Sequence, residues 1–499
     1  MRWKQQKACL AALRQVFGVS GFRPGQKAAV RALLSGRDVL CILPTGAGKS
    51  LCWQLPAVMQ PGLTVVVSPL IALMDDQVRS LHRRGIPAAT LNSLMTRQEL
   101  AAAEQQVRTG AVRILLVSPE RLESEAFVTL CQACPPRLLV VDEAHCVVQW
   151  GGEFRPPYSR IGGFVERLPE RPVLCAMTAT ADEDMQRAVI KSLGMRRPKR
   201  VTLPVMRENL RYSVRTTTDR TGEILRMLRA SPQRTVIFCR SRARTEQLAA
   251  ALRREGFAAE HYHAGLTREE RLLAQERFRT GATACLAATT AFGMGVDIPD
   301  VRCVIHDSLP DTVIDLVQQS GRAGRDGLPA DCVILIGPED LIRSGRILHA
   351  MHASTRLAPL RRRRLMRQHW RPLRTLLDAC LTRRCIPEAL ARSFGQRGRR
   401  CGCCSACADG PLLKRLPALP EMDAADVRLW LLMWQREALA EKLGIPPEQL
   451  VSRAALRRAS RSLTLPQMGE PAAQQAMERL QQAILRTCGT RSGNGRSQP

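Results

Sequence analysis

The chain has 499 residues and a formal net charge of +30, from 75 Lys and Arg residues against 45 Asp and Glu residues. This length predicts several domains, and the excess of positive charge predicts a polyanionic partner. No apolar run approaches the roughly 20 residues that span a bilayer, and the N-terminus lacks the cleavage pattern of a signal peptide. The sequence therefore favours a cytoplasmic protein associated with the nucleoid or chromosome, with no membrane partner.

The first 200 residues alternate short apolar runs with segments of helix length. These runs are VLCIL (39–43), LTVVVS (63–68), RILLVS (113–118), LLVV (138–141) and VLCAM (173–177). The pattern is typical of an α/β fold in which crossover helices join the strands of a doubly wound parallel sheet. Because such sheets bind ligands at the carboxyl ends of their strands, the motif after each run is a candidate for chemistry.

A phosphate-binding loop is indicated by PTGAGKS at residues 44–50, directly after the first apolar run. Gly46 and Gly48 would let backbone amides face phosphate oxygens, Lys49 would supply a compact cation, and Ser50 would offer its hydroxyl to Mg²⁺ at a helix N-terminus. The chain mostly uses arginine, and Lys49 is the only lysine between Lys27 and Lys191. A lysine at this position suits a site where an ammonium must fit between phosphates. A chance glycine turn is the alternative.

A carboxylate pair, Asp142 and Glu143, follows the apolar run at 138–141 and would therefore lie at the same edge of the sheet. Asp142 would hold Mg²⁺, and Glu143 would activate water. Upstream of the phosphate-binding loop, Arg23 and Gln26 could contact an adenine. These residues together predict a site for ATP with Mg²⁺.

The segment after the carboxylate pair carries three aromatic residues, in a chain that is only 4% aromatic. Gln149, Trp150, Phe154, Arg155 and Tyr158 would form a loop beside the nucleotide chemistry. Such a loop can stack on the bases of a nucleic acid. The alternative is a cluster of aromatic side chains buried beneath the loop.

MTATA at residues 177–181 ends the first predicted lobe, where the hydroxyls of Thr178 and Thr180 could link the carboxylate pair to a moving neighbour. The motifs FRPGQ, PTGAGKS, SPLIALMDDQ, DEAHC with the QWG and FRP that follow it, and MTATA resemble, in order and spacing, those of the RecQ family of DNA helicases in helicase superfamily 2. The resemblance implies an ATP-dependent 3′-to-5′ DNA helicase, a DNA-stimulated ATPase that acts in DNA repair, recombination or replication-fork maintenance.

A second lobe is predicted from about residue 206, where apolar runs and polar motifs begin again. QQSGRAGRDG at residues 318–327 resembles the helicase motif that carries arginines across the cleft between two lobes. Arg325 would contact the γ-phosphate as an arginine finger, and Arg322 would couple closure of the lobes to DNA. Asp297 would lie near the ribose. A basic surface turn is the alternative for the two arginines.

The resemblance, together with these residues, gives a complete predicted site. The predicted catalytic residues are Lys49, Asp142, Glu143 and Arg325, and Mg²⁺ would be held by Ser50 and Asp142. The predicted ATP-binding residues are Arg23, Gln26, Thr45, Gly46, Gly48, Lys49, Ser50, Asp297, Arg322 and Arg325. The predicted DNA-coupling residues are His145, Gln149, Trp150, Phe154, Arg155, Thr178 and Thr180.

Residues 343–400 hold sixteen arginines against only two acidic residues, Asp378 and Glu388. So unbalanced a segment favours a surface that follows a phosphate backbone over a merely solvated helix face. Beyond it, Cys401, Cys404 and Cys407 stand at C-x-x-C-x-x-C spacing, sixteen residues after Cys385.

Four thiolates at this spacing can surround a structural zinc ion, and the cluster resembles the zinc subdomain of the RecQ family. Cys403 is an extra thiol beside Cys404, and the spacing favours Cys404 as the ligand. The other C-x-x-C pair, Cys131 and Cys134, has no partner cysteines in the sequence nearby. We expect it to belong to the core.

The predicted fold class is α/β, with two tandem RecA-like lobes followed by helical parts. The predicted domains are 1–205 and 206–342 for the two lobes, 343–410 for an arginine-rich helical zinc-binding subdomain, 411–486 for a helical region, and 487–499 for a disordered tail. The helical region resembles the HRDC module, and a generic helical bundle is the alternative. A winged-helix domain, which commonly follows the zinc site in the family, has no room before the helical region.

The expected partners are ATP and single-stranded and forked double-stranded DNA, with single-strand-binding and recombination proteins as candidates, and the expected state is a monomer. Two other functions stay open at this point. One is a single-strand translocase or annealing protein that unwinds weakly. The other is an ATP-gated DNA-binding scaffold in which hydrolysis matters little.

Overall fold

The computed structural model describes residues 3–69, 71–147, 156–217, 219–292, 298–337, 340, 371–381, 384–409 and 455. Several predicted features lie outside these residues. They are Gln149, Trp150, Phe154, Arg155, Asp297, the arginine run up to residue 370, the tail at 487–499 and all of 411–486 except residue 455. Among the described residues, no helix is both long enough and apolar enough to cross a membrane.

Seven parallel strands form the first sheet, in the order β3-β4-β2-β5-β6-β1-β7. The strands are β1 (Val39–Ile42), β2 (Leu63–Val67), β3 (Ala88–Leu91), β4 (Ile114–Val117), β5 (Pro136–Val141), β6 (Val173–Thr178) and β7 (Lys199–Thr202). The five apolar runs of the sequence are the five inner strands, which are buried because helices cover both faces of the sheet. The two edge strands are partly exposed and carry polar residues.

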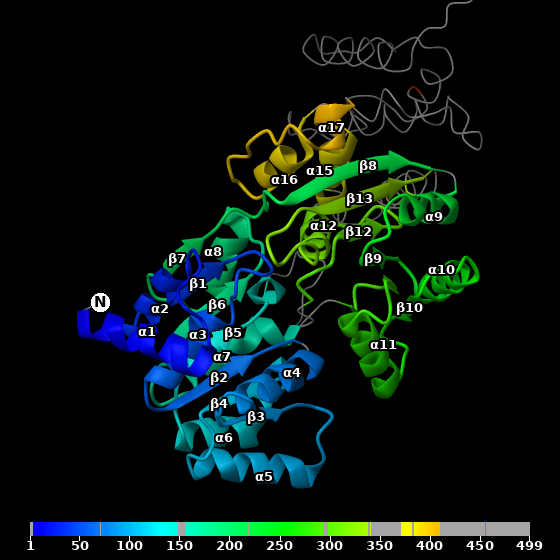
Figure 1. Ribbon diagram of the computed structural model, residues 1–499. Coiled ribbons are helices and arrows are strands. Elements are labelled where there is room, and N and C mark those ends of the chain that lie inside the picture. The colour runs from blue at the N-terminus through cyan, green and yellow to red at the C-terminus, as the bar shows by residue number, and fades with distance from the viewer. Residues whose placement is uncertain are drawn as a thin grey trace, which may run out of the picture.

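Two layers of helices sandwich this sheet (Figure 1). Helices α2 (Gln26–Leu34), α3 (Leu51–Met59) and α4 (Ile71–His82) pack on one face, and α1 (Trp3–Phe17) packs on α2 and α3. Helices α5 (Arg97–Arg108), α6 (Glu125–Ala133), α7 (Ile161–Glu166) and α8 (Glu183–Ser192) pack on the other face. The short 3₁₀ helices are η1 (Pro119–Glu123), η2 (Ala144–Val147) and η3 (Pro156–Arg160).

A second parallel sheet has the order β10-β11-β9-β12-β13-β8. Its strands are β8 (Leu210–Thr216), β9 (Thr235–Phe238), β10 (Ala259–Tyr262), β11 (Cys285–Ala288), β12 (Cys303–His306) and β13 (Ala330–Ile336). Helices α9 (Arg220–Ala230) and α10 (Arg242–Arg254) pack on one face, and α11 (Arg268–Thr280) and α12 (Val313–Ser320) on the other. The predicted pair of doubly wound parallel-sheet lobes is therefore confirmed.

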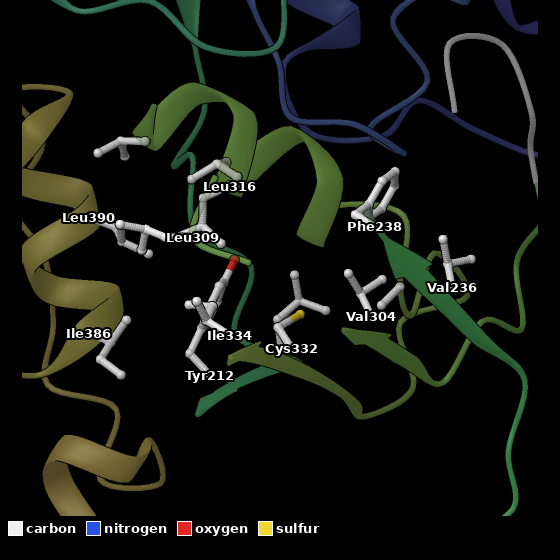
Figure 2. Close-up of a cluster of buried hydrophobic side chains, with 14 of the residues drawn as sticks. Tyr212, Val236, Phe238, Val304, Leu309, Leu316, Cys332, Ile334, Ile386 and Leu390 are labelled. Atoms are coloured by element: carbon white, nitrogen blue, oxygen red, sulfur yellow. The ribbon is translucent and has the colours of Figure 1, made fainter. Parts of the chain in front are cut away.

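The remaining described helices join the second lobe. They are α15 (Arg371–Leu381), α16 (Ile386–Ser393) and α17 (Ser405–Ala408), which lie beside β8 and β13 (Figure 1). Figure 2 shows Ile386 and Leu390 of α16 near Tyr212, Leu316 and Ile334, and all five belong to one buried cluster. The cysteine-bearing part and the second sheet thus share a continuous hydrophobic core.

Candidate active site

The phosphate-binding loop, residues 44–50, leaves β1 at its carboxyl end and leads into α3, whose N-cap is Ser50. Gly46 and Gly48 adopt φ angles of 84° and 76°, a left-handed conformation that side chains disfavour. A Cβ added to Gly48 would lie 2.5 Å from Nε2 of Gln26. Glycine at position 48 therefore meets both a backbone and a packing requirement.

Arg23 and Gln26 hold the backbone of this loop. Arg23 Nη1 donates to the carbonyl of Gly46 at 2.7 Å, and Gln26 Nε2 donates to the carbonyls of Ala47 and Gly48 at 3.2 and 3.0 Å. Gln26 is 1% exposed, and its Oε1 accepts a hydrogen bond from the Arg23 amide at 2.8 Å. Both residues thus lie at the predicted site, and their contact with adenine stays a prediction.

The carboxylate pair lies at the end of β5, beside the loop. The Asp142 amide continues the sheet by donating to the Val67 carbonyl at 2.9 Å, and Asp142 Oδ1 accepts from the Glu143 amide at 3.0 Å. Glu143 has a φ of 46°, a left-handed conformation that is uncommon for a non-glycine residue and is often found at functional sites. Its Oε1 lies 3.9 Å from Lys49 Nζ.

The pKa values of the two carboxyl groups shift in opposite directions. Burial and the charge of Glu143 raise the pKa of Asp142 to about 6. Burial also raises the pKa of Glu143, but the positive charges of Lys49, His145 and Arg322 outweigh it and lower that pKa. The Asp142 carboxylate and the half-buried Ser50 hydroxyl are oxygen donors of the kind that Mg²⁺ prefers, so the chemistry of these residues fits the metal.

His145, on η2, connects the carboxylate pair to β6. Its Nδ1 lies 3.3 Å from Glu143 Oε2 and 3.0 Å from Thr178 Oγ1. The Thr178 hydroxyl in turn donates to the carbonyl of Thr180 at 3.0 Å, and all three residues are buried. Polar contacts therefore run from Glu143 through His145 and the Thr178 hydroxyl to the backbone of Thr180, while the Thr180 hydroxyl, which the sequence also predicted to take part, has no hydrogen-bond partner among the described residues.

Tyr158 does not take the place expected of a base-stacking residue. Its side chain is 0% exposed within the core of the first lobe, and its hydroxyl donates to the Asp142 carbonyl at 3.1 Å. For this aromatic, the buried alternative is the correct one. Tyr158, which lies on η3, therefore supports the backbone of the carboxylate pair through this hydrogen bond.

Residues of the second lobe approach the phosphate-binding loop. An ideal Cβ at Gly321 lies 3.3 Å from Cβ of Thr45, and one at Gly46 lies 3.6 Å from Cγ of Arg325. The charge of Arg322 is among those that lower the pKa of Glu143. The turn after α12 thus brings both predicted arginines to the carboxyl edge of the first sheet.

Arg207, which no sequence motif marked, also lies in this cleft. The cleft is lined by residues of both lobes, which include Thr45, Thr180, Arg207, Gln318 and Gly321. Arg207 Nη1 donates to the Ala323 carbonyl at 3.1 Å, and its Nη2 to that of Gly324. Arginine is abundant in this chain, so nothing in the local sequence marks this one.

Four cysteines converge in the part that packs on β8. The Sγ atoms of Cys385, Cys401, Cys404 and Cys407 all lie within 4.8 Å of one another, the one such group of metal-ligating side chains among the described residues. A tetrahedral four-thiolate zinc site has Zn–S bonds of about 2.3 Å and sulfur pairs about 3.8 Å apart. The cluster is therefore compatible with zinc.

The other cysteines that the sequence singled out lie outside this group. Cys403 is exposed and stands outside the four. Burial raises the pKa of Cys131 to about 12, as expected of a core thiol, while Cys134 is partly exposed.

Comparison with known proteins agrees with this fold. The family model of the DEAD/DEAH box helicases matches residues 23–188, and that of the helicase conserved C-terminal domain matches residues 219–327. The crystal structure of the helicase MrfA bound to DNA and AMPPNP superposes with a TM-score of 0.56 at 20% identity, over 69% of this chain and 52% of that one. Two lobes with these motifs define a superfamily 2 helicase, a class that implies the use of a nucleotide and Mg²⁺.

The sequences of curated relatives identify the family within this class of helicases. The ATP-dependent DNA helicase RecQ of Haemophilus influenzae is 35% identical over 409 residues, which cover 82% of this chain and 64% of that protein. The ATP-dependent DNA helicase RecQ of Synechocystis sp. is 39% identical over 344 residues, covering 67% and 72%. The chain belongs to the RecQ family. It spans slightly less than two thirds of the length of the first of these relatives.

Proposed function

We propose that this protein is a DNA-stimulated ATPase that converts ATP binding and hydrolysis into 3′-to-5′ movement on DNA and unwinding of the duplex. One observation carries the proposal: the phosphate-binding loop and the carboxylate pair of the first lobe face the arginine-bearing turn of the second lobe across one cleft. A site divided between two lobes can close on a nucleotide and open after hydrolysis, which is how a change at ATP becomes a movement of DNA.

Each residue of the cleft has a proposed role in phosphoryl transfer. Lys49 binds the β and γ phosphates, and Glu143 accepts a proton from the attacking water. Nζ of Lys49 lies 3.9 Å from Oε1 of Glu143, and its charge lowers the pKa of this carboxyl group, which keeps the base ionised. Arg325 reaches the γ-phosphate from the second lobe and stabilises the charge of the transition state.

Ser50 and Asp142 would hold Mg²⁺, which neutralises phosphate charge when it is bound. Gln26 and Arg23 keep the loop in shape for this complex through their bonds to its carbonyls. The nucleotide thereby meets a preorganised loop.

The DNA-coupling role is proposed for the chain of contacts from Glu143 through His145 to Thr178 and Thr180. Thr180 lines the cleft between the lobes, so a shift of one lobe changes the surroundings of this chain. In the proposal, Trp150, Phe154 and Arg155 contact single-stranded DNA. The net charge of +30 supports a polyanionic partner.

A structural zinc ion is proposed at the four cysteines. The part that contains them contacts the segment joining the two lobes: Gln396 Oε1 accepts from the Val205 amide at 2.9 Å, and its Nε2 donates to the Leu203 carbonyl at 3.1 Å. A folded zinc site would keep Gln396 in this position. We further propose that the two lobes comprise residues 1–205 and 206–342, and that the protein acts as a monomer.

The proposal is tested with the purified full chain in two assays. ATP turnover is measured with and without a single-stranded oligonucleotide, and strand separation is measured on forked duplexes. Wild type should do both, and Glu143→Gln should do neither while still binding ATP. Unwinding that survives in Glu143→Gln would favour the scaffold alternative, and DNA-stimulated ATP turnover without strand separation would favour a single-strand translocase.

A further inference from the structure

The segment that joins the two sheets does more than connect them. Residues 203–209 lie between β7 of the first sheet and β8 of the second. Within this segment Arg207 and Asn209 both direct their side chains at the backbone of the turn that carries Arg325. The joining segment and the arginine-bearing turn are therefore held together by side-chain contacts.

Four hydrogen bonds make this connection. Arg207 donates to the carbonyls of Ala323 and Gly324, and Asn209 Nδ2 donates to those of Gly324 and Leu328 at 2.9 and 2.7 Å. Gly324 has a φ of 55°, and a Cβ there would lie 2.6 Å from Asn209 Nδ2. Glycine at 324 thus permits the close approach of Asn209.

Arg207 lies at the phosphate-binding loop as well. An ideal Cβ at Gly46 would be 3.8 Å from Arg207 Nη1 and 3.6 Å from Cγ of Arg325. Burial and the charge of Arg325 lower the pKa of Arg207, which reflects two guanidinium groups in one cleft. The Ala323 and Gly324 carbonyls accept hydrogen bonds from Arg207, so this guanidinium already has backbone acceptors in the second lobe while it lies beside the loop.

We propose that Arg207 is a positioning residue for the reaction: it fixes the turn between Arg322 and Arg325, so that Arg325 reaches the terminal phosphate of the nucleotide. This inference rests on the proposed ATPase function. Arg207 belongs to the joining segment, so it also ties the placement of Arg325 to the angle between the lobes. A displacement of about 1 Å in such a group can slow a reaction by roughly a hundredfold.

A double-mutant cycle of Arg207 and Arg325 tests this positioning role. Arg207→Ala should lower the kcat of DNA-stimulated ATP hydrolysis by about 10- to 100-fold, while KM for ATP changes much less. Arg325→Ala should lower kcat at least as much. Because Arg207 acts through Arg325, the double variant should be no slower than Arg325→Ala alone.

Two further variants keep the test interpretable. Arg207→Lys can still donate to the two carbonyls and should recover part of kcat. Arg211→Ala removes an arginine on β8 that pairs with Asp331 and is about half exposed, and it should match wild type. Melting temperature and binding of a fluorescent ADP analogue report whether each variant is folded.

The outcomes distinguish a failure of the positioning role of Arg207 from a failure of the proposed ATPase function. If the losses of Arg207→Ala and Arg325→Ala add, Arg207 contacts the phosphates itself and the positioning role is wrong. Wild-type kcat in Arg207→Ala, together with a large loss in Arg325→Ala, would also overturn it. A wild-type protein that hydrolyses no ATP with DNA present would instead refute the proposed function.

Discussion

Nδ1 of His145 lies 3.0 Å from Oγ1 of Thr178, which joins the segment after the carboxylate pair to the end of β6. The two residues are 33 positions apart in the chain and both are buried. Glu143 contacts the same imidazole, so the hydroxyl of Thr178 helps to set the position of the proposed base. A buried network of this kind is sensitive to the loss of any one member.

Thr178→Val therefore tests the coupling role. Valine keeps the shape of the side chain and removes the hydroxyl, so folding should be retained. We expect DNA-stimulated ATP turnover to fall by about tenfold, which corresponds to about 1.4 kcal/mol, one hydrogen bond to a catalytic group. Unwinding should fall further than hydrolysis. Equal rates in the variant and wild type would remove the hydroxyl from the mechanism.

Glycine at position 48 should be essential for nucleotide binding. In Gly48→Ala the new methyl group collides with Gln26, which holds the loop. The matched control is Gly36→Ala, since Gly36 has the same φ of 76° but open space around it. Both variants carry a backbone cost of about 1 kcal/mol in melting experiments. Only Gly48→Ala should lose binding of a fluorescent ATP analogue, and equal binding by both would show that Gln26 does not shape the loop.

Zinc content distinguishes the two adjacent cysteines. Cys404 is buried within the group of four sulfur atoms, whereas Cys403 is exposed and outside it. Metal analysis should find about one zinc per chain in wild type and in Cys403→Ser, and much less in Cys404→Ser. A strong chelator should lower the melting temperature of wild type, because α16 and α17 lose their shared anchor. Zinc retained by Cys404→Ser and lost from Cys403→Ser would reverse the assignment.

Asp38 is expected to be the most costly acidic residue to remove from the first lobe among those described. Its carboxylate is 3% exposed, forms an ion pair with Arg171 and accepts hydrogen bonds from the amides of Leu174 and Arg196 at 3.0 and 2.7 Å. Asp38→Ala would leave these two buried amides without their acceptor and would remove the ion-pair partner of the half-buried Arg171 guanidinium. The free energy of unfolding should fall by about 3–5 kcal/mol in urea titrations.

Asp184→Ala is the control for that measurement. Asp184 also pairs with an arginine, Arg187, but both side chains are mostly exposed. Its removal should leave the unfolding midpoint nearly unchanged, because water replaces the partner. Similar midpoints for the Asp38 and Asp184 variants would mean that burial does not decide the strength of these ion pairs.

Sequence patterns predicted the five inner strands of the first sheet, the existence of a second lobe, and the grouping of the phosphate-binding loop with the carboxylate pair. These features depend on local chemistry: apolar runs buried on both faces, and glycines that permit a left-handed backbone. The edge strands β3 and β7 were missed because partly exposed strands lack a continuous apolar run. Tyr158 was misplaced, since an aromatic residue in a loop looks the same whether it is buried or exposed.

The contacts of Arg207 could not be predicted from the sequence for a different reason. Its acceptor at Ala323 is 116 positions away and is a backbone carbonyl, so no residue type at either end signals the contact. Gln26 is similar, because its amide holds the backbone of residues 47 and 48. Contacts from side chains to distant backbone become visible only when the fold is known.

The central claim is that DNA controls the reaction in the cleft between the lobes, and the rate of ATP hydrolysis tests it most directly. Purified full-length protein is assayed at saturating ATP and Mg²⁺ while a single-stranded oligonucleotide is titrated. We predict a low rate without DNA and a steep, saturable increase with it. A rate that is the same with and without DNA would contradict the account.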